Sequence, residues 1–350
     1  MDNNKNQSTM KTKQLFLLCT LWLTVSLTAL AQEPVATLEH SGTTKVYYGE
    51  GSFEQAYSAS VNGDQIYLSS GRFTFTNIAK GLKIYGAGTS NRNFIKETVL
   101  YRITYNSKNE ELHDPMPINK GADSLRLEGL YINQGIYFSP DLINYVKIIR
   151  CNVGSVQFSN NFKNNCSIEE CIVNSNIDFS KLGNNFLVRN SVIGGFISNI
   201  NGNALIDGNI FLNKATQTNF TIRDVNYSTI QNNIFVYGQY YGKNTNSTLV
   251  NNLFLNYVGE VGGQNNWVTS GSDAFIRRLN DTFSYYDDYH LKNTTTFLGT
   301  DGTPVGIYGG LGFKEQGVPS NPQIINKTIS PKTDDKGNLQ INITVKAQDN

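Results

Sequence analysis

Apolar residues recur along this chain in short runs, and the runs return at a nearly constant interval. Seven segments between residues 127 and 254 can be aligned, and their first positions are spaced 21, 20, 20, 18, 24 and 19 residues apart. Each segment holds two short apolar runs separated by polar or small residues. The runs are too short to show the 3.6-residue period of a helix. Self-similarity at a fixed period is the signature of a repeat architecture.

Two positions of the aligned segments are apolar in every repeat. The first position holds Leu127, Ile148, Ile168, Val188, Ile206, Ile230 and Leu249, and the last holds Ile132, Val153, Val173, Ile193, Phe211, Phe235 and Phe254. A repeat near 20 residues is too short for a propeller blade, and it lacks the Leu-x-x-Leu-x-Leu run of leucine-rich repeats. The pattern therefore predicts an all-β parallel solenoid, whose turns stack at strand spacing with both columns facing the core.

A third regularity lies between the two apolar columns. The fourth position of the repeat changes along the chain from Leu130, Cys151, Cys171 and Ser191 to Asn209, Asn233 and Asn252. The chain has 45 asparagines, of which 26 fall in residues 151–266. Because Asn tolerates left-handed backbone and bonds its own backbone in turns, this distribution indicates one tight bend per repeat. We expect the three Asn to form a ladder of stacked amides at that bend.

The two ends of the repeat region predict different structures. Residues 52–61 place Phe53, Ala56, Tyr57 and Val61 on one helical face, which predicts a short helix that caps the first turn. Two strand-like runs at 323–329 and 339–345 flank a turn-rich stretch and predict a C-terminal β-hairpin. The expected organisation is a signal peptide (1–31), an N-terminal cap (32–62), a parallel β-helix (63–315) and a hairpin or tail (316–350).

The amino terminus has the order of a secretory signal. Lys11 and Lys13 precede an apolar run from Leu15 to Leu30, and small residues follow at Ala29 and Ala31. The run has about 16 residues, fewer than the ~20 of a spanning helix, so no membrane span is expected after cleavage. We expect export to the periplasm, the cell surface or the medium. Three cysteines would then remain, and we expect them to be buried, inert thiols. Since Cys151 and Cys171 fall in one column on successive turns, a thiol stack or a bridge between those turns is the alternative.

Charge and composition exclude several classes of function. Lys and Arg number 29 against 28 Asp and Glu, which leaves a net charge of +1 and no excess for binding nucleic acid. Three His and four Cys disfavour a His/Cys zinc site. Aromatic residues make up 11% of the chain, which disfavours disorder. The sequence predicts no cofactor and carries no signal for the oligomeric state.

The second and third columns of the repeat supply candidate catalytic residues. Stacked turns would bring several charged side chains into one surface patch: Glu128, Arg150, Glu169, Glu170, Arg189 and Asp207. Enzymes that cleave glycans by acid–base catalysis use a pair of carboxylates, here with arginine beside them. The alternative is a surface ladder of alternating charges, in which each ion pair contributes about 0–1 kcal/mol.

Aromatic residues supply a candidate ligand site. Tyr237, Tyr240 and Tyr241 follow the sixth aligned strand, Trp267 comes one turn later, and the longest repeat carries Arg223 and Asp224. Exposed rings stack on sugar faces while Asn and Asp bind the hydroxyls, which predicts polysaccharide as the partner. The alternative is packing of these rings against the solenoid wall. A third cluster at residues 285–289 contains Asp287 and Asp288, whose carboxylates are suited to bind Ca²⁺. We expect no metal, and a calcium site at this cluster is the alternative.

Three stretches carry a family resemblance. Residues 63–73 after the predicted helix, together with Tyr289-His290-Leu291 and the glycine-rich stretch 299–310, resemble right-handed parallel β-helix proteins of the pectin-lyase-like superfamily over about residues 35–315. The resemblance implies the right-handed fold and an exported bacterial protein. The Asn-Thr-Asp, Gly-His-Gly and Arg-Ile-Lys blocks of its hydrolases are absent, as are the Trp-x-Asp-His and Arg-x-Pro-x-x-Arg blocks of its pectate lyases.

The absence of these catalytic motifs makes an enzyme less favoured than a binding protein. We expect an exported, non-catalytic protein that binds polysaccharide or another surface polymer. A polysaccharide lyase or glycoside hydrolase with a divergent active site is the first alternative. An adhesin or a structural spacer is the second.

Overall fold

The computed structural model describes residues 33–90, 97–105, 111–159, 163–179, 183–213, 221–237, 246–256, 261–269, 274–310, 312–314, 317–330 and 332–346. The predicted signal peptide lies outside these residues. Residues 34–350 form one compact unit, which we describe below. None of the helices in the described ranges has the length and apolar character needed to cross a membrane.

The first sheet has eleven strands and runs the length of the repeat region. Nine of them are parallel and follow one another turn by turn, and the antiparallel strands β1 and β2 extend the sheet at its N-terminal end. In spatial order the strands are β2 (Thr43–Tyr48), β1 (Val35–His40), β3 (Gln65–Leu68), β5 (Lys83–Tyr85), β10 (Arg126–Glu128), β13 (Lys147–Ile149), β17 (Ser167–Glu169), β21 (Phe186–Arg189), β24 (Ala204–Asp207), β27 (Thr229–Gln231) and β29 (Thr248–Val250).

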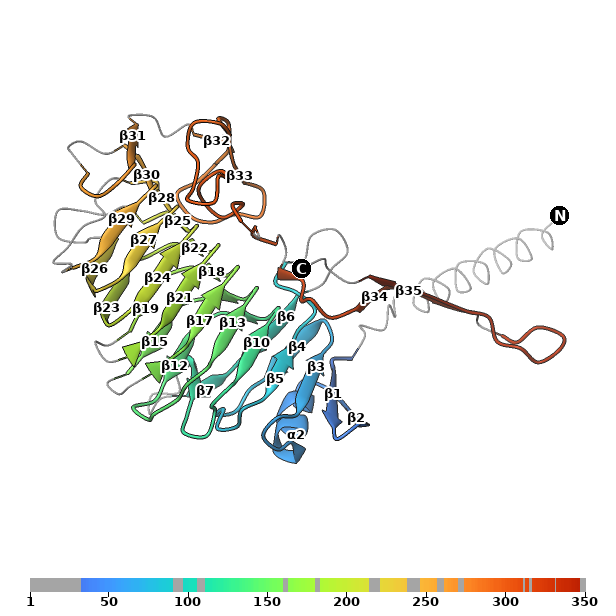
Figure 1. The fold of residues 1–350 in the computed structure, drawn as a ribbon. Coiled ribbons are helices and arrows are strands. Elements are labelled where there is room, and N and C mark those ends of the chain that lie inside the picture. The colour runs from blue at the N-terminus through green and yellow to red at the C-terminus, as the bar shows by residue number, and fades with distance from the viewer. Residues whose placement is uncertain are drawn as a thin grey trace, which may run out of the picture. The chain divides into compact units, whose positions relative to one another are not determined.

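Two further parallel sheets complete each turn, and the strands of successive turns lie side by side (Figure 1). The second sheet contains β31 (Trp267–Thr269), β30 (Leu253–Leu255), β28 (Ile234–Phe235), β25 (Ile210–Phe211), β22 (Val192–Ile193), β18 (Ile172–Val173), β14 (Asn152–Val153), β11 (Tyr131–Ile132), β6 (Thr98–Tyr101) and β4 (Gly71–Thr74). The third contains β26 (Ile222–Asn226), β23 (Ile197–Asn201), β19 (Ile177–Asp178), β15 (Val156–Phe158), β12 (Ile136–Phe138) and β9 (Met116–Ile118). The fold is therefore an all-β parallel solenoid, as predicted.

The predicted register is confirmed in both apolar columns. Ile148 pairs with Ile168, Ile168 with Val188, and the same column continues to Leu249 without a shift. The last column pairs in the same way and ends in a stack of Phe211, Phe235 and Phe254. Adjacent ring centroids in that stack are 4.7 Å apart, and the ring planes are within 3° of parallel. Both columns are buried and form the centre of the core.

The bend between the first and second sheets explains the choice of residues in the third column. All seven residues of this column have a left-handed backbone, with φ from 47° to 68°: Gly129, Arg150, Glu170, Asn190, Gly208, Asn232 and Asn251. Glycine and asparagine adopt this conformation most readily, which accounts for five of the seven positions.

The fourth column forms the expected ladder of side chains. The backbone N–H of Asn209 donates to Oδ1 of Asn233 (2.9 Å), and the N–H of Asn233 donates to Oδ1 of Asn252 (3.0 Å). The same pattern continues to Asn266 at one end and to Ser191 at the other. All members from Ser191 to Asn252 are fully buried, so these amides satisfy backbone groups that water does not reach.

Shorter elements lie at the ends and edges. Helix α2 (Ser52–Ala59) buries Phe53 and Ala56 in the main core, and it matches the helix predicted over 52–61. The predicted hairpin is confirmed as β34 (Gln323–Ile329) paired with β35 (Ile341–Lys346). Three more pairs join β7 (Ile103–Tyr105) to β8 (Glu111–His113), β16 (Lys163–Asn164) to β20 (Gly183–Asn184), and β32 (Phe275–Arg277) to β33 (Asp288–Leu291). The right-handed sense and the capping role of α2 stay predictions.

A second hydrophobic core lies against the outer face of the second sheet. Its solenoid side is a column of apolar residues that begins at Ile172 and continues through Val192, Ile210, Ile234 and Leu253. Its other side comes from the chain after the last parallel strand and includes Phe275, Tyr289, Leu291, Val305, Ile307 and Phe313. The last strand of the parallel sheets is β31, although the β-helix was expected to extend to residue 315. The later residues named above pack against the solenoid wall and add no turn to it.

Candidate functional site

The charged columns lie where the repeat alignment places them, and their side chains are largely paired with one another. Arg150 lies between two glutamates, with Nε 2.9 Å from Oε2 of Glu170 and Nη1 3.6 Å from Oε1 of Glu128. Nη2 of Arg126 is 2.6 Å from Oε2 of Glu128, and Nη2 of Arg189 is 2.5 Å from Oε2 of Glu169. This patch contains alternating charges in contact across successive turns.

The C-terminal chain covers one end of this patch. The backbone N–H of Ser320 donates to Oε1 of Glu128 (2.9 Å), and Nη1 of Arg150 contacts the carbonyl of Val318. Gly129 lies against this segment, since a Cβ atom at that residue would come within 2.8 Å of Pro319. Glu128 is fully buried and Arg150 is 5% exposed. These two predicted catalytic residues therefore bind the covering segment and do not face a substrate.

The other end of the patch borders a pocket of about 170 Å³. Its solenoid wall is the outer side of β21 and β24 with the adjoining bend, and its opposite wall is the loop 299–310. The charged and hydrogen-bonding side chains that line it are Arg189, Asn190, Asp207, Asn232, Asp301 and Thr303. The pocket therefore combines two residues of the predicted patch, Arg189 and Asp207, with residues almost 100 positions further along the chain.

The left-handed asparagines hold the loop against the solenoid. Nδ2 of Asn190 donates to the carbonyls of Ile307 and Gly309, both at 2.9 Å. Asn232 accepts the N–H of Thr300 at Oδ1 (2.9 Å), and its carbonyl accepts the N–H of Gly306 (2.8 Å). Gly306 has φ 95°, and a Cβ atom there would come within 2.6 Å of Ile234 in the second core. The loop is therefore fixed to the wall on both sides of the pocket.

Asp207 and Asp301 both line the pocket, and the hydrogen bonds of each use only one carboxylate oxygen. Oδ1 of Asp207 accepts Nδ2 of Asn232 (2.7 Å) and Nε2 of Gln231 (3.3 Å). Oδ1 of Asp301 accepts the N–H (2.9 Å) and the hydroxyl (2.7 Å) of Thr303. Within the described ranges, neither Oδ2 atom accepts a hydrogen bond. Two oriented carboxylates with a free oxygen each are suited to accept hydrogen bonds from hydroxyl groups.

The electrostatics of the pocket are acidic. Burial raises the pKa of Asp207, the amides of Asn232 and Gln231 and the charge of Arg189 oppose that rise, and the negative charge of Asp301 adds to it. Arg189 is itself paired with Glu169, so it only partly offsets the two pocket carboxylates. An anionic ligand would meet unfavourable charge here, whereas a neutral hydroxylated ligand would not.

The predicted aromatic site is not assembled by the described residues. Tyr237 and Trp267 pack against the second core, where the hydroxyl of Tyr237 donates to Asp281 and Trp267 meets the edge of Phe297. Arg223 lies in the third sheet with its guanidinium 3.9 Å from the ring centroid of Phe196, and Asp224 is its neighbour in β26. Tyr240 and Tyr241 fall outside the described residues. The role of these six residues in binding stays a prediction.

The carboxylates of the 285–289 cluster have partners within the protein. Asp287 accepts the N–H of Leu279 (2.9 Å) and the hydroxyl of Tyr289 (3.0 Å), and Asp288 contacts Nδ1 of His290 (2.7 Å). Across the described part of the chain, no group of three or more His, Cys, Asp or Glu is arranged to hold a metal ion.

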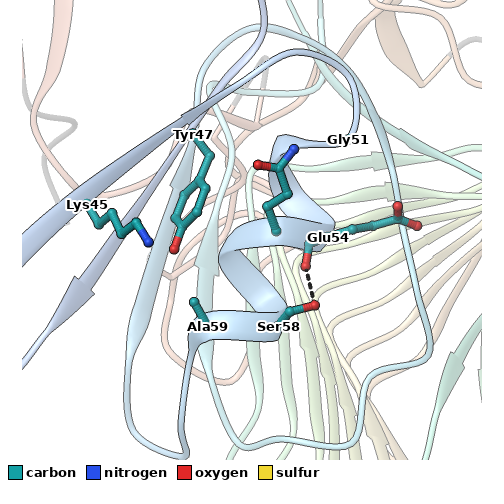
Figure 2. A pocket seen from close by; sticks show the side chains of 7 residues that line it. Lys45, Tyr47, Gly51, Glu54, Ser58 and Ala59 are labelled. Carbon is teal, nitrogen blue, oxygen red and sulfur yellow. Dashed lines mark hydrogen bonds between the residues drawn. The ribbon is translucent and has the colours of Figure 1, made fainter.

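A broader depression lies between strand β2 and helix α2. Figure 2 shows Lys45 and Tyr47 on the strand facing the helix, with Glu54 and Ser58 on the helix side. Nζ of Lys45 is 5.0 Å from the ring centroid of Tyr47, and the Tyr47 hydroxyl is buried without a hydrogen-bond partner in the described structure. The depression lacks the paired carboxylates and the fixed loop of the pocket at Asp207, which we take as the candidate site.

The repeat alignment identified half of this pocket. Arg189 and Asp207 belong to aligned columns, whereas Asp301 and Thr303 lie in a stretch that has no repeat period. The available signal was the Thr300-Asp301-Gly302-Thr303 sequence, because an Asp two residues before a Thr commonly forms a turn that orients its carboxylate. Comparisons with family models, curated proteins and solved structures gave no match to this chain.

Proposed function

We propose that this protein is an exported, non-catalytic β-solenoid that binds a neutral polysaccharide at the pocket between Asp207 and Asp301. One observation carries the proposal: two carboxylates from opposite walls of one pocket each present an oxygen without a hydrogen-bond partner in the described structure. Sugar hydroxyls donate to such oxygens. The resemblance to exported β-helix proteins agrees with this proposal but does not identify the polymer.

The size and charge of the pocket narrow the ligand class. A volume of about 170 Å³ corresponds to roughly six water molecules at ~30 Å³ each, space that one sugar residue can fill. The acidic balance around Asp207 and Asp301 disfavours carboxylated sugars. We therefore propose a neutral sugar residue, either at a chain end or as a branch of a longer polymer.

The test is affinity electrophoresis in gels that contain soluble neutral polysaccharides, with hydroxyethylcellulose, xyloglucan and galactomannan as probes. The double variant Asp207→Asn/Asp301→Asn removes both carboxylates but keeps the side-chain shapes and the Oδ1 acceptors. We expect it to bind at least about tenfold more weakly, the cost of losing hydrogen bonds to two charged groups. Asp335→Asn, at an exposed carboxylate in the turn between β34 and β35, is the control and should bind like the wild type. Equal retardation of the wild type and the double variant contradicts the proposal.

The raised pKa of Asp207 favours one alternative, a glycoside hydrolase. In that reaction Asp207 would protonate the departing glycosidic oxygen while Asp301 removes a proton from water, whose oxygen bonds to the anomeric carbon. The raised pKa would keep the acid protonated to a higher pH than an ordinary aspartate. Release of reducing ends from the same polysaccharides, abolished in Asp207→Asn and falling as the pH rises through the raised pKa, would establish this alternative. A lyase acts on polymers that contain uronic acid, so formation of an unsaturated, ultraviolet-absorbing product from an acidic polysaccharide would instead indicate a lyase.

A further inference from the structure

The bend that leads from the third sheet into the first carries one residue per turn in a single column, and the residues are exposed except in the turn of Asn165, where the residue is half-buried. The register of the first sheet places Tyr145, Asn165, Asn185, Asn203 and Tyr227 directly above one another, because each lies two residues before a paired strand position. Backbone hydrogen bonds continue this alignment into the bend, from Tyr145 to Asn164 (3.0 Å) and from Asn165 to Asn184 (3.1 Å). We call these five residues the edge column.

The backbone of the edge column suits asparagine and not tyrosine. Tyr145, Asn165, Asn185 and Tyr227 have φ of 60°, 56°, 58° and 55°. Asn adopts this left-handed conformation readily, whereas a bulky aromatic residue there is uncommon and strained. The chain therefore carries tyrosine at two positions where asparagine, the residue of the intervening turns, would suit the fold better. Such a departure from local preference is characteristic of functional positions.

The two rings are more than half exposed and have no polar or aromatic partner in the described part of the chain. The side chains of Tyr145 and Tyr227 are 56% and 55% exposed. Among the described residues, neither has a ring contact or a hydrogen bond to its hydroxyl, in contrast to Tyr237, which contacts Arg278 and Asp281. These rings therefore contribute little to the packing of the described fold. Exposed tyrosine rings offer an apolar face and a polar tip to a ligand.

The amides between the two rings keep free donors and acceptors. Nδ2 of Asn185 donates to Oδ1 of Asn165 (3.1 Å), which leaves Nδ2 of Asn165 and Oδ1 of Asn185 without partners in the described structure. Asn203 is exposed, and its side-chain amide has no hydrogen bond to a described residue. Oriented amides beside aromatic rings form the combination that binds the hydroxyls and ring faces of sugars.

A second ladder behind the edge column holds its backbone in place. Oδ1 of Asp123 accepts the backbone N–H of Asn144 (3.0 Å), Oδ1 of Asn144 accepts that of Asn164 (3.1 Å), and Oδ1 of Asn164 accepts that of Asn184 (3.1 Å). Because these bonds fix successive turns relative to one another, the exposed side chains stand on a rigid support. Preorganisation of this kind lowers the entropic cost of binding.

The distance along the column selects an extended ligand. Tyr145 and Tyr227 are separated by four turns, a span of about 19 Å at ~4.8 Å per turn. A single sugar residue cannot reach both rings. No member of the edge column is charged at neutral pH, so an acidic or basic polymer gains no ion pair from it.

We propose that the edge column is a contact surface for an extended neutral polysaccharide lying along the stack of turns. Tyr145 and Tyr227 stack against sugar rings at its two ends, and Asn165, Asn185 and Asn203 bind hydroxyls between them. This inference shares the ligand class of the proposed function but uses a different surface. The edge column lies where the strands of the first sheet begin, whereas the pocket at Asp207 lies where they end.

The test uses the double variant Tyr145→Asn/Tyr227→Asn in the same electrophoresis gels. Asparagine is the residue of the intervening turns and suits the backbone, so we expect an unchanged or higher melting temperature and at least a tenfold loss of affinity for the polysaccharide. Tyr145→Phe/Tyr227→Phe keeps the stacking faces and should retain most binding. Tyr48→Asn removes a tyrosine that is 62% exposed on β2 and is the matched control.

Three outcomes overturn the inference: a wild type that no gel retards, a double Asn variant retarded like the wild type, and a Tyr48→Asn variant that loses binding equally. The two proposals fail separately. Loss of binding in the tyrosine variant alone supports the edge column and contradicts the pocket, whereas loss in Asp207→Asn/Asp301→Asn alone does the reverse. Competition adds a second readout, since oligosaccharides long enough to bridge both rings should compete and a monosaccharide should not.

Discussion

At the bend, side chains of the fourth column accept hydrogen bonds from backbone groups that have no partner in the strands. Asn233 is fully buried; its Oδ1 accepts the N–H and the amide of Asn209, and its Nδ2 donates to the carbonyl of Ile206 (2.8 Å) and to Asn252 (3.0 Å). Cys171 and Ser191 accept the same backbone bond in earlier turns, with a thiol and a hydroxyl in place of an amide. From Cys171 to Asn252 the column holds three residue types, and each side chain accepts a hydrogen bond from the preceding turn.

Replacing Asn233 with leucine should destabilise the fold strongly. The change leaves the N–H of Asn209 buried without a partner, at about 1–3 kcal/mol, and it removes the hydrogen bonds from Nδ2 of Asn233 to Ile206 and Asn252. Chemical denaturation should show a lower midpoint with an unchanged slope. Asn280→Leu, at an exposed residue outside the ladder, is the control. A similar midpoint for the two variants would show that the ladder does not support the stack.

The buried thiols predict a loss of stability in alkaline solution. Burial raises the pKa of Cys151 from about 9 to about 12 and also raises that of Cys171. Because the unfolded chain releases these protons at lower pH than the folded chain, stability is complete below pH 9 and falls as the pH rises toward 12. The melting temperature of the wild type should drop more over this range than that of Cys151→Ser/Cys171→Ser, in which the hydroxyls keep the ladder. Parallel curves for the two proteins would contradict this assignment.

The elements after β31 serve the solenoid as a cover. Phe275 in β32 and Tyr289 in β33 pack edge to face, with ring centroids 5.5 Å apart, over the apolar outer face of the second sheet. The loop 299–310 and the segment 317–320 then follow the left-handed bend, where they contact Asn232, Asn190, Arg150 and Glu128 in turn. One stretch of chain therefore shields the second sheet, builds the pocket and closes the charged patch.

Truncating Phe275 tests this cover. Phe275 is 1% exposed, so Phe275→Ala should cost about 3–5 kcal/mol of unfolding free energy. Leu279 lies four residues later and is 63% exposed, so Leu279→Ala should cost little. The difference is measured by denaturant titration of both variants. If Phe275→Ala costs no more than Leu279→Ala, the second core is not part of the cooperative fold.

The sequence predicted the repeating elements, the short helix and the C-terminal hairpin, but it missed the cover formed after β31. The aligned columns from Leu127 to Leu249 gave the register correctly, because a one-residue slip would turn every core residue outward. The cover was missed because Phe275 and Ile307 belong to no period and contact residues far away in the chain. One signal was present, since the apolar column from Ile172 to Leu253 faces away from the main core and requires a partner. Asp207 was identified by its column, whereas Asp301 could be placed opposite it only by the fold.

At the scale of the whole molecule, the near-neutral chain predicts binding without long-range electrostatic attraction. The net charge is +1, and most charges of the patch are paired across turns. Neither the pocket nor the edge column would bind its ligand through ion pairs. Affinity for a neutral polysaccharide should therefore change by less than about twofold between low salt and 0.5 M salt, where screening acts within ~10 Å or less. A steep loss of affinity with salt would indicate an anionic polymer and contradict the proposed ligand class.

Hydrogen-exchange mass spectrometry of the full chain, with and without the best-retarding neutral polysaccharide, locates the residues that the sugar protects. We predict slower exchange in peptides that contain residues 204–208 and 299–310, where the two carboxylates share a pocket, and no change there in Asp207→Asn/Asp301→Asn. Slower exchange in peptides around Tyr145 and Tyr227 would report the edge column separately. Protection confined to other parts of the chain, or none at a saturating polysaccharide concentration, would contradict the claim that the pocket between Asp207 and Asp301 binds sugar.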